Sequence, residues 1–327
     1  MRMKVDLGIV LVVFAVLCGR AAASVGDRLP EFRDCVSRCV ASVCETSPQL
    51  PLYLTVFAWT CPQNCDYECQ RTITAERIAA NKEVVQFHGK WPFKRFLGIQ
   101  EPASVIFSML NFVPHYRTYK YFTSPLSPPI DDVHAGFYMK KYYVLVTIVG
   151  MNAWVWSSVF HCRDFKLTER LDYFSAGITV MTGFYFAVVR VFRLDRPAKK
   201  PLRRLLTIAC VLSVLSHISY LSFVRFSYTY NMAANVVVGL LQNALWIYFS
   251  IKTYFFSEKR ETRALVPLFN VLLLSAAMSL ELFDFSPFLD TIDAHSLWHA
   301  ATVLPSFWYY DWMKADAAHE TGVKLKL

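Results

Sequence analysis

The residues YYVLVTIVGMNAWVWSSVF, from Tyr142 to Phe160, form an apolar run that contains no charged side chain. A helix of about 20 such residues spans the hydrocarbon core of a bilayer, so this run predicts a membrane span. Six further segments have similar length and character: Phe96–Pro114, Leu171–Phe192, Leu202–Phe223, Met232–Ile251, Ala264–Leu282 and His295–Met313. We therefore predict an all-α fold whose residues 96–313 form a seven-transmembrane helix bundle.

The composition agrees with a membrane protein and argues against a nucleic-acid partner. The 327 residues are 55% hydrophobic and only 18% charged, whereas soluble domains are about one quarter charged. The net charge of +9 could indicate nucleic-acid binding, but the basic residues cluster between the apolar runs, as in RVFRLDRPAKKPLRR at 190–204. This distribution is typical of cytosolic loops. We expect contact with membrane lipid and none with nucleic acid.

The first 23 residues have the pattern of a secretory signal peptide. Arg2 and Lys4 precede the apolar run Leu7–Cys18, and Ala21–Ala23 provides a small-residue cleavage site. Cleavage would place Ser24 in the oxidising lumen. The Lys and Arg residues concentrate in the connections that follow the first, third and fifth predicted spans, which makes those connections cytosolic. We expect a luminal N-terminus and a cytosolic tail at residues 314–327.

Residues 24–95 form a predicted luminal head with six closely spaced cysteines. Six cysteines in a short luminal stretch indicate a disulfide framework with fifteen possible connectivities. Spacings of four residues place cysteines on one face of each of two helices. Nested bridges in a helical hairpin would then join Cys35–Cys69, Cys39–Cys65 and Cys44–Cys61. The alternative is a zinc cluster, although the head lacks the usual C-x-x-C spacing.

Polar side chains at the luminal ends of three predicted spans are the candidate site. His161 ends the second span, Asp172 begins the third, and His295 and His299 stand one helical turn apart in the seventh. Three histidines with one open position are typical of catalytic zinc, which lowers the pKa of its water to about 7 and makes hydroxide available. Asp172 could take the water's proton, and Ser157 could donate a hydrogen bond to a developing oxyanion.

Other interpretations of these residues stay open. Histidines at a membrane interface can simply extend toward lipid headgroups, and a serine such as Ser157 can satisfy helix backbone, with Ser158 as its neighbour and rival. A Ser-His-Asp triad is also conceivable, but it leaves His295 and His299 without a role, and the chain has no G-x-S-x-G motif. His217, midway along the fourth span, is better explained as a packed polar residue.

Three segments carry a resemblance to a known family: GIQEPASVIFSMLN (98–111), NAWVWSSVFHCRDFKLTERLDYFSAG (152–177) and DAHSLWHAAT (293–302). They resemble the GPI-anchor-remodelling lipases known as post-GPI attachment to proteins factor 3, within a superfamily of seven-span metal hydrolases that includes alkaline ceramidases and adiponectin receptors. The resemblance implies that His161, His295 and His299 bind zinc while Asp172 and Ser157 assist catalysis.

The same resemblance implies a substrate and a compartment. Family members are phospholipase A2-type hydrolases that remove the sn-2 acyl chain of GPI-anchored proteins in the endoplasmic reticulum membrane, with the Golgi membrane as the alternative. Two other functions remain possible at this stage. One is a ceramidase-like amide hydrolase that uses the same residues, and the other is a seven-span receptor or cargo-folding factor without enzymatic activity.

Overall fold

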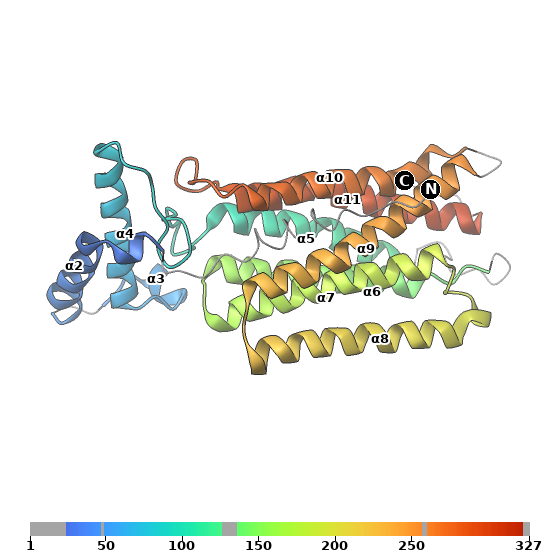
Figure 1. The fold of residues 1–327 in the computed structure, drawn as a ribbon, viewed down its shortest axis with the longest axis horizontal. Helices are drawn as coiled ribbons and strands as arrows, with labels where there is room; N and C mark the ends of the chain where they lie inside the picture. Colours follow the sequence, from blue (N-terminus) through green and yellow to red (C-terminus); the bar gives the residue numbers. More distant parts are fainter. Residues whose placement is uncertain (1–23, 47–48, 126–135, 257–259, 323–327) are drawn as a thin grey trace, which may run out of the picture.

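The structure is a computed structural model that describes residues 24–46, 49–125, 136–256 and 260–322. Within these ranges the regular elements are helices, apart from three isolated β-bridges. The head contains α2 (Pro30–Cys39), α3 (Leu52–Val56) and α4 (Cys61–Ala79), and Figure 1 shows it beyond one end of a long helix bundle. The bundle consists of α5 (Pro102–Thr123), α6 (Lys140–Cys162), α7 (Lys166–Val191), α8 (Lys200–Ser219), α9 (Tyr228–Phe255), α10 (Val266–Leu282) and α11 (Ala294–Thr321). The all-α prediction is confirmed. The predicted signal peptide lies outside the described residues.

Five helical segments of the described chain are long and apolar enough to cross a membrane. They are α6, α7, Pro197–Val224 with α8 at its centre, α9, and Thr262–Leu280, which contains most of α10. The outward side chains of the bundle agree with this, because large apolar residues such as Leu212 and Leu240 are more than half exposed. Apolar side chains that face outward in this number would be unfavourable in water and are expected in lipid.

The helices α5 and α11 fall outside that group because their inward faces are polar. The buried polar side chains of α5 are Ser104, Ser108, Asn111, His115 and Thr118. Those of α11 are Ser296, His299, Thr302 and Asp316. The two faces bind each other: the Asn111 side-chain amide donates to the His299 carbonyl at 2.7 Å, and the Tyr310 hydroxyl lies 2.6 Å from Nδ1 of His115. Polar groups inside a bundle lower a segment's mean hydropathy although lipid does not contact them.

The first helix of the bundle starts later than the predicted span Phe96–Pro114. Pro102 occupies the first turn of α5, and the preceding Glu101 is non-helical, with φ −129° and ψ 74°. Proline disfavours the helical conformation in the residue before it and suits the first turn of a helix, so the helix cannot extend back to Phe96. Instead Phe96 and Ile99 form a short antiparallel bridge. The predicted boundary was therefore wrong by about two turns.

The last helix begins close to the predicted position but continues beyond Met313. The Asp293 side chain accepts from the backbone N–H of Ser296 and caps the start of α11. The helix runs on to Thr321 and ends at Gly322, whose φ of 70° lies in the left-handed region that glycine adopts easily. Residues 314–321, which we expected in a tail, are helical, and Asp316 and Ala317 are buried.

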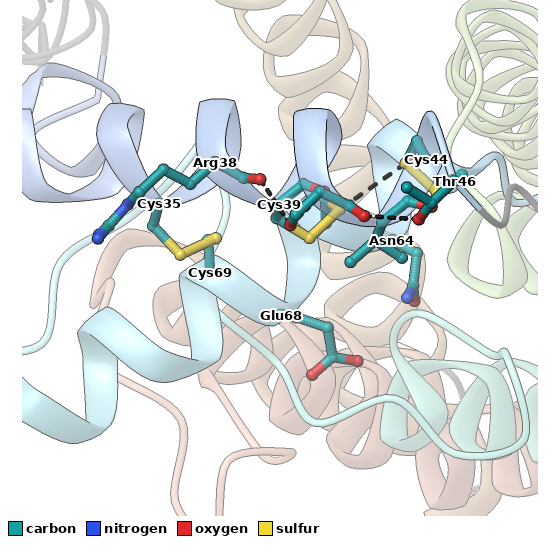
Figure 2. The surroundings of a disulfide bond; sticks show 12 residues. Cys35, Arg38, Cys39, Cys44, Thr46, Asn64, Glu68 and Cys69 are labelled. Carbon is teal, nitrogen blue, oxygen red and sulfur yellow. Dashed lines mark hydrogen bonds between the residues drawn. A yellow bond between two sulfur atoms is a disulfide. The ribbon is translucent and has the colours of Figure 1, made fainter.

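The six head cysteines form the three nested disulfides expected from their spacing (Figure 2). Cys35–Cys69, Cys39–Cys65 and Cys44–Cys61 have Cα–Cα distances of 5.8, 5.7 and 5.7 Å, within the usual range for a bridge. They join α2 and the turn after it to α4. With all six sulfurs in disulfides, none of them is a thiolate that could bind zinc in this structure.

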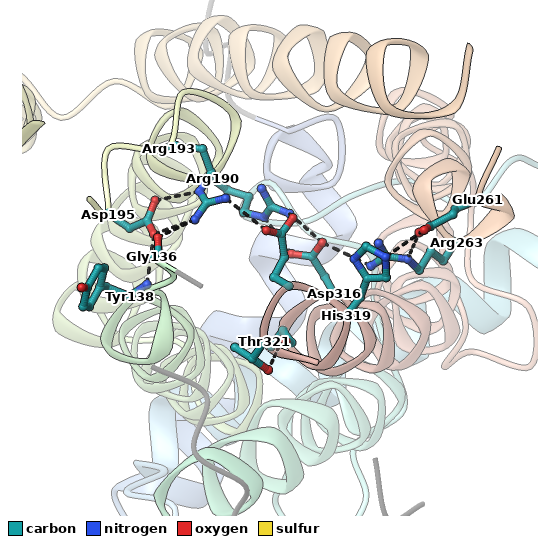
Figure 3. Close-up of polar contacts among 12 residues, drawn as sticks. Gly136, Tyr138, Arg190, Arg193, Asp195, Glu261, Arg263, Asp316, His319 and Thr321 are labelled. Carbon is teal, nitrogen blue, oxygen red and sulfur yellow. Dashed lines mark hydrogen bonds and ion pairs between the residues drawn. The ribbon is translucent and has the colours of Figure 1, made fainter. Parts of the chain in front are cut away.

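Ion pairs fasten α7 to α11 at the end of the bundle far from the head (Figure 3). The Arg190 guanidinium donates from Nε and Nη2 to the two Asp316 carboxylate oxygens at 2.7 Å each, and from Nη2 to Glu320 at 2.8 Å. Arg190 and Asp316 are only 4% and 2% exposed. Two-pronged, buried pairs of this kind hold two helices in one register.

Candidate metal centre

Three imidazole rings meet at the end of the bundle that faces the head. His161 lies in the last turn of α6, and His295 and His299 lie in the first two turns of α11. Nε2 of His295 is 3.3 Å from Nε2 of His161 and 3.0 Å from Nε2 of His299. One ligand atom from each ring lies within 4.8 Å of the others. The structure thus brings together residues that are 134 positions apart in the chain.

The spacing of these nitrogens fits a divalent metal ion. Zinc binds imidazole nitrogen at about 2.0–2.1 Å in tetrahedral geometry, so two nitrogens on one ion lie about 3.3–3.4 Å apart. The rings converge through Nε2, and His161 and His299 are 1% and 2% exposed. Three convergent imidazoles, two of them buried and His295 half-buried, match the three-ligand set of catalytic zinc sites, in which a fourth position is left for water or substrate.

The Glu101 carboxylate orients His161. Its Oε2 lies 2.7 Å from Nδ1 of His161, so the imidazole donates its Nδ1–H to the carboxylate and leaves Nε2 free as a ligand. The backbone supports the same pairing, because the N–H groups of Gln100 and Glu101 donate to the carbonyls of Cys162 and His161 at 3.0 Å. Glu101 had no role in the sequence interpretation. Its signal was a carboxylate within an apolar run, directly before a helix-starting proline.

A lysine from the head completes this arrangement. The Lys90 ammonium lies 2.6 Å from Glu101 and 2.8 Å from Asp164, and 4.3 Å from the centre of the Phe160 ring. Burial would lower the pKa of Lys90, but the two carboxylates outweigh burial and raise it. Burial would raise the pKa of Glu101, but Lys90 and His161 bring it well below its ordinary value. Both groups therefore remain charged, and Lys90 links the head to the histidine centre.

Two serines adjoin the third histidine. The Ser108 hydroxyl on α5 lies 3.0 Å from the Ser157 hydroxyl and 3.3 Å from Nδ1 of His299, and all three residues are buried. Ser158 instead donates to the Trp154 carbonyl at 2.8 Å within its own helix. Of the two neighbouring serines, Ser157 is therefore the one that faces the centre. Ser108 was missed by sequence reasoning because nothing in its surroundings distinguishes it from a packing serine.

Asp172 is half-buried in the second turn of α7, the helix that follows His161 at the end of α6. His217, by contrast, lies on α8 with Nε2 3.0 Å from the Asn231 side-chain oxygen, so it is a packed polar residue as expected. The site thus combines three convergent imidazoles with carboxylates and hydroxyls on different sides. Such a set can bind a cation, activate water and stabilise negative charge on an oxygen.

A known family matches most of the chain. Residues 51–317 match the Per1-like family, a range that contains α3, α4, the bundle up to Ala317 and every residue of the histidine centre. The chain belongs to the Per1-like family. It is 44% identical over 308 residues to the protein PER1 homolog of Schizosaccharomyces pombe, covering 91% of this chain and 89% of the relative.

Other Per1-like relatives align over almost their full length. Protein PER1 of Saccharomyces cerevisiae is 37% identical over 95% of this chain and 97% of its own. The Homo sapiens protein named GPI-specific phospholipase A2-like PGAP3 is 35% identical over 97% of this chain and 98% of its own. No solved structure matches the chain significantly. Membership of the Per1-like family therefore rests on sequence, and the geometry of the centre comes from the structure described above.

Proposed function

We propose that this protein is a zinc-dependent, GPI-specific phospholipase A2-type hydrolase that removes the sn-2 acyl chain from the lipid of GPI-anchored proteins. The observation that carries the proposal is the convergence of the Nε2 atoms of His161, His295 and His299, spaced at 3.0–3.3 Å, at the head end of the bundle. The name of its relatives, GPI-specific phospholipase A2-like PGAP3, supports the substrate.

The arrangement in the membrane supports the same proposal. We infer that α5 and α11 cross the bilayer together with the five apolar segments, which places the head and the histidines on the luminal side and the end of α11 in the cytosol. GPI anchors lie in the luminal leaflet, and an sn-2 ester lies just below the headgroup, at the depth of the histidine centre. The endoplasmic reticulum membrane is the proposed location, with the Golgi membrane as the alternative.

The residues around the centre have distinct proposed roles. His161, His295 and His299 would hold zinc, and zinc when bound supplies positive charge for the ester carbonyl and lowers the pKa of water. Glu101 fixes the tautomer of His161 through Nδ1. Ser157 donates a hydrogen bond to the oxyanion of the tetrahedral intermediate. Asp172 accepts the proton of the attacking water and returns it to the leaving glycerol oxygen, which yields a fatty acid and a lyso-lipid.

Metal analysis and lipid analysis of the same variants test the proposal. We expect close to one zinc per purified chain, and we expect His299→Ala to lose both the zinc and the production of lyso-GPI in cells that lack the endogenous protein. His217 lies on α8 and bonds Asn231 on α9, so His217→Ala should retain both the zinc and the production of lyso-GPI. Wild-type remodelling by a His161→Ala, His295→Ala double variant would refute the proposal.

A further inference from the structure

A pocket of about 430 Å³ lies between the head and the head-facing end of the bundle. Its walls combine aromatic rings with long cationic side chains, among them Trp59, Tyr67, Trp91, Lys90, Arg95 and Arg163. Lys90 lines this pocket and also binds Glu101, the residue that orients His161. A molecule held in the pocket therefore lies next to the histidine centre and within the luminal part of the proposed enzyme.

Two arginines stack on one indole ring in the wall of the pocket. The guanidinium carbons of Arg95 and Arg163 lie 4.3 and 3.8 Å from the centre of the Trp59 ring, and that of Arg95 also lies 3.5 Å from the Tyr67 ring. The Trp59 indole N–H donates to the Gly98 carbonyl at 2.8 Å, which fixes the ring. Stacking places both cations rigidly without neutralising their charge.

Both guanidinium groups keep a buried donor that no protein atom in the described part of the chain accepts. These donors are Nη1 of Arg95 and Nε of Arg163. The Arg95 side chain is 7% exposed and Arg163 is 8% exposed, so bulk water does not readily satisfy them. Their other nitrogens bind neutral amides, since Arg95 donates to Asn64 at 2.6 Å and Arg163 to Gln63 at 2.8 Å. Buried donors of this kind are satisfied by an ordered water or by an acceptor from a ligand.

The carboxylates that line the pocket already have other partners. Asp164 pairs with Lys90 at 2.8 Å, and Asp66 lies 2.9 Å from His88. The carboxylate nearest to Arg95 is the exposed Glu68, at 3.5 Å. The two arginines therefore leave positive charge in the pocket, beside aromatic faces. Guanidinium groups bind phosphate oxygens in two-pronged fashion, and an aromatic face packs against the apolar face of a sugar ring.

We propose that this pocket binds the phosphate-bearing sugar headgroup of the lipid substrate, with Arg95 and Arg163 on the phosphate and Trp91 in the same wall beside the sugars. This inference rests on the proposed function and adds to it the site that selects the headgroup. Because Lys90 joins the pocket to Glu101, a headgroup bound there holds its own acyl ester close to the histidines. The head thus acts as the specificity element of the enzyme and not only as a scaffold.

Binding of a soluble headgroup to the full-length protein in detergent micelles tests the inference. The probe is a deacylated glycosyl-inositol phosphate, titrated by calorimetry. We expect Arg95→Gln to weaken binding at least tenfold, whereas Arg77→Gln, which alters an arginine of α4 that bonds the Glu83 carbonyl outside the pocket, should bind as wild type. Inorganic phosphate and the unphosphorylated glycan should each bind at least tenfold more weakly than the probe.

The outcomes separate this inference from the proposed function. If wild-type protein fails to bind the probe at millimolar concentration, or if Arg95→Gln binds as wild type, the headgroup pocket is refuted even when lyso-GPI is still produced. If the probe binds in an Arg95-dependent way but no fatty acid is ever released, the pocket stands and the hydrolase proposal fails. The zinc content of each variant reports whether it has folded. If Arg95→Gln misfolds, the titration of the wild-type protein still tests the pocket, because failure to bind the probe refutes it.

Discussion

A carboxylate oxygen of Glu101 lies 2.7 Å from Nδ1 of His161, and the two residues come from segments that are 60 positions apart. Glu101 stands just before α5, and His161 is in the last turn of α6. The contact therefore couples the start of one helix to the end of the next through the ring of a candidate metal ligand. Carboxylate-to-histidine contacts of this kind orient the ligand and increase its basicity.

Replacing Glu101 should weaken metal binding without removing the metal ligands. We expect Glu101→Gln to lower zinc affinity about 10- to 100-fold, because the amide accepts a weaker hydrogen bond from the imidazole. Competition with a chelator of known affinity measures the change. Glu83→Gln, in an exposed part of the head, is the matched control and should match wild type. An unchanged zinc affinity in Glu101→Gln would show that the carboxylate does not serve the centre.

Alanine variants of Ser157, Ser108 and Ser158 should differ in turnover and in zinc affinity. Ser157→Ala removes the proposed oxyanion donor and should lower kcat about 100-fold with zinc retained. Ser108→Ala also removes a partner of His299, so we expect it to lower zinc affinity as well as turnover. Ser158→Ala only frees the Trp154 carbonyl and should remain near wild type. Equal activity of the Ser157 and Ser158 variants would contradict the role given to Ser157.

Breaking the buried pair between α7 and α11 should destabilise the bundle while leaving the distant histidine centre able to bind zinc. Arg190→Met removes the two-pronged partner of the Asp316 carboxylate, which is 2% exposed and keeps only the longer contact to Arg263 at 3.7 Å among the described ion pairs. The free energy of unfolding should fall by about 3–5 kcal/mol. Thermal unfolding in detergent measures the loss. Adding Asp316→Leu removes the stranded charge, so the double variant should recover most of the stability. If the double variant is less stable than the single one, the ion pair itself stabilises the bundle, and the loss in Arg190→Met does not come from an unpaired buried charge.

The head should become less stable as pH rises through neutrality. A hydrogen bond from His88 to Asp66 raises the pKa of His88 above its ordinary 6.5 against an opposing effect of burial, with Asp27 adding charge. Stability from the protonated ring is fully present below pH 6.5 and is lost as pH rises through the higher folded-state pKa. Hydrogen exchange at residues 86–90 should quicken over that range, only modestly because the ring is exposed. His88→Gln should abolish this dependence.

Engineered glycosylation sites test the membrane orientation, since the natural chain contains no N-x-S/T sequence. Glu83→Thr completes such a site at Asn81 in the head, and Arg260→Asn completes one before Thr262 in the connection between α9 and α10. Both positions are exposed. We expect the first variant to gain an endoglycosidase-sensitive glycan and the second to gain none. The reverse pattern would invert the proposed topology.

Local sequence patterns predicted that the helices exist, although not where α5 begins, and they favoured one cysteine pairing among fifteen and a cluster of histidines. Cysteines four residues apart can share a helix face, and His295 and His299 share one for the same reason, so spacing alone placed them together. Glu101, Lys90 and Ser108 were not predictable in this way. Their contacts depend on how the segment before Pro102 folds back against the end of α6 and on where the head rests, and neither arrangement leaves a periodic signature in the chain.

The polar inner faces of α5 and α11 explain why hydropathy alone undercounts the proposed spans. A hydropathy test treats every side chain as if lipid surrounded it, whereas Asn111 and Thr302 contact each other at 3.2 Å inside the bundle. Two of the polar side chains that lower the mean hydropathy of α5, Ser108 and Asn111, contact His299 of the centre. Low hydropathy in a bundle helix is here a mark of the site.

The position of two histidines on α11 has a consequence for biogenesis. Every other helix of the bundle precedes α11 in the chain, so the ribosome completes His295 and His299 after the rest of the centre has already entered the membrane. Before α11 is made, the nascent protein holds one imidazole of the trio, so the proposed hydrolase would have no complete centre with which to cleave the surrounding lipid. The order of synthesis would thus act as a safeguard for the proposed enzyme, whose activity could begin only when the final helix inserts.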